Sequence, residues 1–240
     1  MNIEKTEGAV MLFHPMDIFI FIAFLISLWA QWKVSSNFNA WSEVPASSGL
    51  TGAEVARMIL DRHGLHHVPV EVVPGRLSDH YDPISRTVRL SEPVFYGRSI
   101  ASISVAAHEV GHAVQHQQGY AALVLRHRMF PIVNFASGVA PLLLLVGFVL
   151  HQFSLIGLGI LFFSLAVAFQ IITLPVEFNA SARAKRFMLA EGLIAPNEAR
   201  GVNKVLGAAA LTYVAATLIA VFELLKYVLI FTQGNNNEES

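Results

Sequence analysis

Four long apolar runs constrain this chain more than any other feature of its sequence. They lie at residues 16–32, 131–150, 155–174 and 205–222, and the last can be extended to residue 232. Each run has about 17 to 20 residues, enough for a helix rising ~1.5 Å per residue to cross ~30 Å of hydrocarbon. The chain is 54% apolar and 14% charged, a balance typical of membrane proteins. We therefore expect four transmembrane helices with the lipid bilayer as a partner.

The charged residues predict how these helices are oriented. The first run is read as a retained span and not as a signal peptide, because Glu4, Lys5 and Glu7 precede it without a clean basic region. Basic residues flank the spans in two segments, and the positive-inside rule places both segments on the cytoplasmic side of the membrane. These residues are Lys33, Arg126, Arg128, Arg183, Lys185, Arg186, Arg200 and Lys204. Four spans then put both termini outside. The net charge of −1 argues against a nucleic-acid partner.

The longest polar segment, residues 33–130, is expected to fold as a domain at the membrane surface. Thr51 and Glu54 form a capping box that starts a helix. Residues 68–73 and 86–90 are predicted strands, and residues 77–83 between them are a turn-rich polar connection. Residues 99–118 are a further helix. The predicted fold class is thus a mainly α membrane protein of α+β type, with a small β-sheet in its surface domain.

That last helix contains His108-Glu109-Val110-Gly111-His112. Residues four apart share one face of a helix, so the two imidazoles can reach one zinc ion. Glu109 then lies beside the metal, where it can take the proton of a zinc-bound water. The chain has no cysteine, so thiolate-bound zinc and disulfides are both excluded.

A catalytic zinc needs a third protein ligand. His116 continues the same helix face, but ligands at positions 108, 112 and 116 would span ~12 Å of helix, too far for one ion. We interpret His116 as a group that supports the site or an interface. Glu177 is the better candidate because it follows a span on the same side as the histidines. A carboxylate at a helix start is also favoured by the helix dipole, so spacing alone leaves both interpretations open.

The chain resembles the YugP-like neutral zinc metallopeptidases of bacterial membranes, zincins with a third glutamate ligand, over nearly its whole length. The resemblance is carried by residues 29–33, 49–53, 77–83, 98–100, 106–112, 173–181 and 208–215. It implies a zincin-like catalytic domain at 33–130, in which His108, His112 and Glu177 hold one Zn²⁺ and Glu109 is the catalytic base.

The resemblance leaves the residues around the ligands open. The wider group usually has an acid four residues after the glutamate ligand, where this chain has Ser181. A carboxylate that orients a ligand imidazole is therefore unassigned, with Asn179, Asp79 and Asp82 as alternatives. Three side chains are candidates to stabilise the oxyanion, although each also has an ordinary structural explanation; they are His80, Tyr81 and Tyr213. Residues 77–90 are the expected substrate-facing sheet edge.

The sequence thus predicts a membrane-embedded zinc endopeptidase that hydrolyses peptide bonds by Glu109-assisted attack of zinc-bound water, with a membrane-associated protein or peptide as substrate. Its active site is expected to face the cytoplasm. The predicted parts are 1–32, 33–130, 131–174, 175–204, 205–232 and a disordered tail, 233–240. The alternatives are a non-catalytic, zinc-stabilised membrane adaptor and a protease that cleaves within the bilayer. A transporter is disfavoured because the spans carry few ionisable groups.

Overall fold

Four long helices dominate the fold. The computed structural model describes residues 14–238, and the predictions that concern residues 1–13 lie outside this part. The four helices are α1 (Met16–Ser42), α5 (Ala121–Val149), α6 (Phe153–Ala190) and α7 (Ala199–Glu238). Within the described part these four are long and apolar enough to cross a membrane. The mainly helical membrane fold is therefore confirmed.

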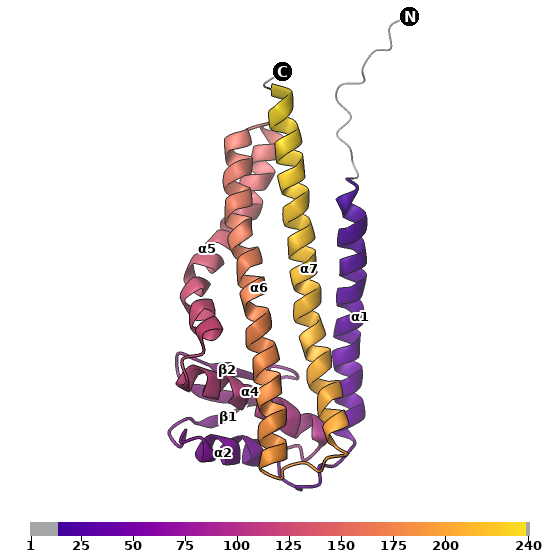
Figure 1. Ribbon diagram of the computed structural model, residues 1–240, viewed down its shortest axis with the longest axis vertical. Coiled ribbons are helices and arrows are strands. Elements are labelled where there is room, and N and C mark those ends of the chain that lie inside the picture. Colours follow the sequence, from indigo (N-terminus) through magenta and orange to yellow (C-terminus); the bar gives the residue numbers. More distant parts are fainter. Residues whose placement is uncertain (1–13, 239–240) are drawn as a thin grey trace, which may run out of the picture.

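The long helices run side by side along the molecule (Figure 1). The pairs α5 with α6, α1 with α7, and α6 with α7 pack along one another. Large apolar side chains face outward from this bundle; the exposed fraction is 60% for Phe21, 64% for Phe135 and 60% for Leu142. Such surfaces are costly in water and natural in lipid, because a bilayer supplies the apolar surroundings that they need.

The helices are longer than the sequence predicted. α1 continues ten residues past Trp32 to Ser42, and α5 begins at Ala121, so that Pro131 lies inside it. The run at residues 155–174 predicts a helix end just before Pro175, and this was wrong, since α6 passes through Pro175 to Ala190. A proline costs a helix one hydrogen bond, but a helix held by packing on both sides tolerates it. α7 likewise extends to Glu238, into the tail for which disorder was expected.

The polar elements gather at one end of the bundle, at the bottom of Figure 1. The helix α2 (Gly52–Arg62) starts with the predicted capping box, in which the Thr51 hydroxyl accepts from the Glu54 amide at 3.1 Å and the Glu54 carboxylate from the Thr51 amide at 2.7 Å. A short helix, α3 (Glu92–Phe95), precedes α4 (Ile100–Gln117), where the Ser99 side chain caps the first turn.

Three strands form the small sheet. They are β1 (Val70–Val73), β2 (His80–Asp82) and β3 (Thr87–Ser91). The order is β1-β3-β2, with β1 parallel and β2 antiparallel to the central β3. The prediction of a plain connection at 77–83 was wrong, because β2 lies within it and forms one edge of the sheet. Its three residues are too few to show the alternation by which a strand is recognised.

The helix α4 lies at the centre of the polar end, packed against α1, α2, α5, α6 and α7. Fourteen of its eighteen residues are buried. Small residues allow this close packing, above all Gly111, where an added Cβ would lie 2.8 Å from the carbonyl oxygen of Ala180 on α6. The two helices therefore approach backbone to backbone at the position of the His-Glu-x-x-His sequence.

Candidate metal centre

Two histidines of α4 and one glutamate of α6 meet at this contact. His108 and His112, one turn apart, have ring centroids separated by 4.8 Å. The Glu177 Oε2 atom lies 3.3 Å from Nε2 of His108 and 3.5 Å from Nε2 of His112. One ligand atom from each of the three residues lies within 4.8 Å of the others, so the group could hold a metal ion.

The environment of Glu177 fits a bound cation. Its side chain is 4% exposed, and its buried Oε2 atom accepts no hydrogen bond from any group in the described part of the chain. A buried carboxylate oxygen without a partner is costly. A divalent metal ion between this oxygen and the two imidazole nitrogens would remove that cost. Two histidines and one carboxylate, without thiolates, are a donor set found at catalytic zinc sites, which keep a fourth position open.

Each imidazole is oriented through its other ring nitrogen. Nδ1 of His108 lies 3.1 Å from the Ser181 hydroxyl, and Nδ1 of His112 lies 3.0 Å from the Gln115 side-chain oxygen. Both contacts leave Nε2 directed at Glu177. A proton on Nδ1 and a free lone pair on Nε2 is the tautomer that a metal ligand requires.

The orienting groups differ from those considered in the sequence. Asn179 contacts Gln115 and not an imidazole. The Gln115 side-chain amide donates to the Asn179 side-chain oxygen and to the Val176 carbonyl, both at 2.9 Å. Asp79 instead accepts hydrogen bonds from the Ser91 backbone amide and hydroxyl. Asp82 accepts from Arg89 at 2.7 Å. A neutral hydroxyl and a neutral amide thus take the place where a carboxylate was expected.

Glu109 lies beside the ligand group, on the same helix. It is buried, and it borders two cavities that meet at the site. Burial raises the pKa of the Glu109 carboxyl above its usual value, while the neighbouring His108 and His112 act in the opposite direction. Because a base is most effective when its pKa approaches the working pH, a raised pKa suits a group that takes up and releases a proton.

Arg126 of α5 makes a contact with Glu177 that the sequence did not predict. Its Nη1 atom lies 3.1 Å from Oε1 of Glu177, the oxygen that does not face the histidines. The arginine therefore holds one carboxylate oxygen and leaves the other directed at the two imidazoles. Its position in the first turns of a long apolar helix suggested only a membrane-flanking charge.

The three candidates for oxyanion stabilisation have different surroundings. Tyr213 of α7 borders both cavities together with His108 and Glu109. The Tyr81 hydroxyl is 2.9 Å from Nδ1 of His116, and burial raises the pKa of Tyr81 to about 12. His80 is exposed at the edge strand β2, with Nδ1 2.8 Å from the Ser78 carbonyl.

Comparison with known proteins agrees with this geometry. A family model described as "Putative neutral zinc metallopeptidase" matches residues 16–232. The chain belongs to this family. A similar relative, "Putative membrane protease YugP" of Bacillus subtilis (strain 168), is 66% identical over 220 residues, which is 91% of this chain and 98% of the relative. No solved structure matches the chain.

In this member of the metallopeptidase family, the candidate ligand group lies where two cavities adjoin. One, of about 580 Å³, lies between β2, α5 and α6 and is bordered by Arg126, Phe130 and Phe169. The other, of about 420 Å³, lies between α1, α4 and α7. Both volumes are in the range of small-molecule and peptide side-chain pockets. His116 contacts Tyr81 and His127 and lies outside the candidate group of His108, His112 and Glu177.

Proposed function

We propose that the protein is a zinc-dependent endopeptidase that hydrolyses peptide bonds of proteins at the membrane surface. One observation carries this proposal: two imidazole Nε2 atoms and the unpaired Oε2 atom of Glu177 converge, with a buried carboxylate, Glu109, next to them. A structural metal site needs ligands alone. The additional carboxylate at the junction of two cavities supports a catalytic function.

In this mechanism His108, His112 and Glu177 would hold one zinc ion per chain. When bound, zinc lowers the pKa of a coordinated water toward ~7 and polarises a carbonyl group. Glu109 accepts a proton from the attacking water on its carboxylate and then donates that proton to the leaving amine nitrogen. The Ser181 and Gln115 side chains keep both imidazoles in the ligand tautomer throughout.

Of the three oxyanion candidates, Tyr213 is the one that we assign this role. It borders both cavities at the site, so a substrate carbonyl next to Glu109 lies within its reach. A neutral hydroxyl can donate a hydrogen bond to the developing negative charge. The Tyr81 hydroxyl is already paired with His116 and is less available, and His80 stands further out on the edge strand.

The position along α6 supports a site at the membrane surface. Glu177 follows the start of α6 at Phe153 by 24 residues, which is ~36 Å of helix against ~30 Å of hydrocarbon. Trp29 and Lys33 form a cation–π contact of 4.2 Å at the corresponding level of α1, as residues at a membrane interface do. The helix α4 is not among the candidate spans of the described chain, which argues against cleavage inside the bilayer.

The basic residues support a cytoplasmic site in a bacterial inner membrane, as the positive-inside rule requires. Arg126 and Lys33 stand beside the spans at the end that carries the catalytic elements, and Arg183 and Lys185 lie on the same end of α6. Substrates that reach such a site are membrane proteins or membrane-associated segments. The edge strand β2 borders the larger cavity, where an extended peptide can align with it.

A Glu109→Gln variant tests the proposal. The full-length protein in lipid nanodiscs should keep one zinc per chain, measured by elemental analysis, because glutamine removes the base and not a ligand. Cleavage of casein and of membrane-protein substrates should fall at least about 100-fold. Wild-type protein that binds zinc and cuts none of these substrates would contradict the proposal and favour a zinc-stabilised adaptor.

A further inference from the structure

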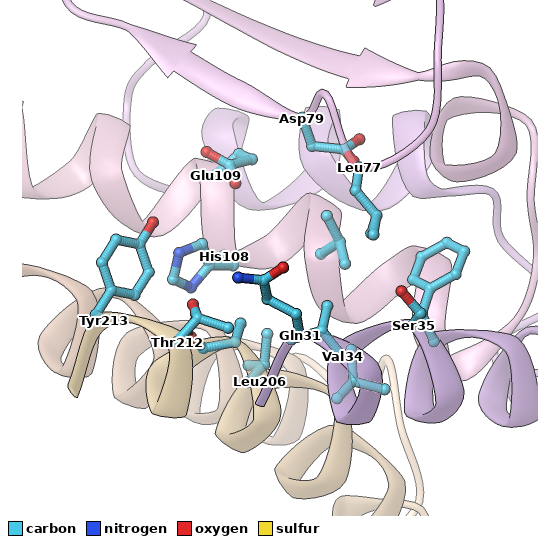
Figure 2. A pocket seen from close by; sticks show the side chains of 14 residues that line it. Gln31, Val34, Ser35, Leu77, Asp79, His108, Glu109, Leu206, Thr212 and Tyr213 are labelled. Atoms are coloured by element: carbon cyan, nitrogen blue, oxygen red, sulfur yellow. Dashed lines mark hydrogen bonds between the residues drawn. The ribbon is translucent and has the colours of Figure 1, made fainter. Parts of the chain in front are cut away.

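The smaller cavity has walls of a different chemistry from the metal centre. Its volume is about 420 Å³, and Figure 2 shows Glu109, His108 and Tyr213 gathered at one end. The remaining wall comes from the cytoplasmic ends of α1 and α7 and from the segment before β2. Most of that wall is aliphatic or aromatic; it includes Val34, Phe38, Leu77, Val105, Leu206 and Ala209.

This cavity adjoins the larger one at the proposed catalytic residues. Asp79, His108, Glu109 and Tyr213 border both. We therefore interpret the two cavities as halves of one cleft, with the proposed base and a candidate ligand histidine at its middle. An extended peptide with its scissile bond beside Glu109 would place the residues on the two sides of that bond in different halves.

The two halves differ in charge. The larger half contains the guanidinium of Arg126 and the Glu177 carboxylate, together with His127. In the smaller half, the lining residues other than Asp79, His108, Glu109 and Tyr213 carry no formal charge. The polar ones among them are Gln31, Ser35 and Thr212. A charged side chain placed there would lose its hydration without gaining a partner, whereas an apolar side chain gains from leaving water.

From this we propose that the smaller half is a specificity subsite, which binds an aliphatic or aromatic side chain of the substrate residue on one side of the scissile bond. The inference rests on the proposed endopeptidase function and adds a substrate class to it: segments with a leucine- to phenylalanine-sized residue at the cleavage site. Leu206 and Ala209, which lie three residues apart on α7, set the size of the pocket.

Peptide libraries and two opposed variants test this subsite. Full-length protein in nanodiscs is incubated with peptides in which each position carries alanine, leucine, phenylalanine or aspartate, and products are identified by mass spectrometry. Wild-type protein should prefer leucine or phenylalanine over aspartate at one position beside the cut by at least about tenfold in kcat/KM. Ala209→Leu fills the pocket and should lower the phenylalanine-to-alanine ratio about tenfold. Leu206→Ala enlarges the pocket and should raise that ratio.

Gly207→Leu is the matched control. An added Cβ at Gly207 meets nothing within 4 Å, so this variant places a leucine on the same turn of α7 away from the cavity. It should keep the wild-type profile. In addition, a peptide with photoreactive leucine at the selected position should label Val34 or Leu206 when it is irradiated with the Glu109→Gln protein.

The outcomes separate the two proposals. A wild-type protein that cuts no peptide refutes the endopeptidase function and the subsite with it. A wild-type protein that cuts, with a side-chain profile that stays the same in both Ala209→Leu and Leu206→Ala, refutes the subsite alone. The same conclusion follows if Gly207→Leu shifts the profile as much as Ala209→Leu does, or if the photoreactive label is found only on α5 and β2.

Discussion

Replacing Gly111 by alanine would force α4 away from α6. A Cβ at this position would lie 2.8 Å from the carbonyl oxygen of Ala180 and 3.3 Å from its Cα. Both are backbone atoms, so no side-chain rotation relieves the contact. Ordinary contact begins at 3.4 Å, which means that the two helices must separate or slide by about 0.6 Å.

The magnitude follows from two opposing terms. A glycine-to-alanine change inside a helix gains ~1 kcal/mol of stability, and overpacking a tight contact costs ~1–3 kcal/mol. The net loss of stability is therefore at most ~2 kcal/mol. The metal centre suffers more, because Glu177 lies one turn before Ala180 on the displaced helix. Sites of this kind tolerate displacements of ~0.5 Å, so zinc affinity should fall about 10- to 100-fold.

The assay compares Gly111→Ala with Gly207→Ala, where an added Cβ meets nothing within 4 Å. Zinc affinity is measured by competition with a chelator, and thermal unfolding is followed in the metal-free protein. We expect Gly207→Ala to bind zinc as the wild type does, with equal or higher thermal stability. If Gly111→Ala also binds zinc with wild-type affinity, the ligand group does not depend on the close approach of α4 and α6, and the reasoning fails.

Three further changes test other contacts of the site. Glu177→Ala should lower zinc affinity at least about 100-fold, because it removes the only carboxylate of the ligand group, and equilibrium dialysis measures this. Gln115→Ala should lower affinity about 10- to 100-fold through loss of the His112 contact, and wild-type affinity would contradict this role. Burial raises the pKa of the Asp79 carboxyl above its usual value of 3.8, although hydrogen bonds from Ser91 oppose the shift; ionised Asp79 therefore lowers the stability of the folded state above its folded-state pKa, and this loss disappears as pH falls toward 3.8. Asp79→Asn should therefore gain more thermal stability relative to wild type at pH 8 than at about pH 4, and an equal difference at both would oppose this account.

The membrane helices and the histidine helix could be predicted because their signals are local. Apolar runs long enough to span a bilayer have few alternative structures, and a spacing of four residues brings His108 and His112 together on any helix. Helix ends were predicted less well. The apolar runs predict helix boundaries at Pro131 and Pro175, yet both prolines lie inside helices whose neighbours supply the packing.

The remaining contacts of the centre depend on tertiary structure. Glu177 is 65 residues from His112, and its local sequence is as typical of a carboxylate at a helix start as of a metal ligand. Only the family resemblance favours the ligand interpretation. Arg126 carried only the signal of a charge near a span. For Gln115 a weak local signal existed, since a residue three positions after His112 lies on the same helix face. Without the position of α6, that face had no known neighbour.

The continuity of α6 through Pro175 fixes the depth of the site. If the helix ended at Pro175, Glu177 would lie on a separate helix. Its distance from the bilayer would then depend on the conformation of the segment that joins the two helices. As a single helix of 38 residues, α6 is ~57 Å long, nearly twice the thickness of the hydrocarbon. Its apolar part is held by the lipid, and its last turns pack against α4. In the proposed function, the carboxylate ligand would therefore stay at a constant height above the membrane, and substrates would be segments that reach this level.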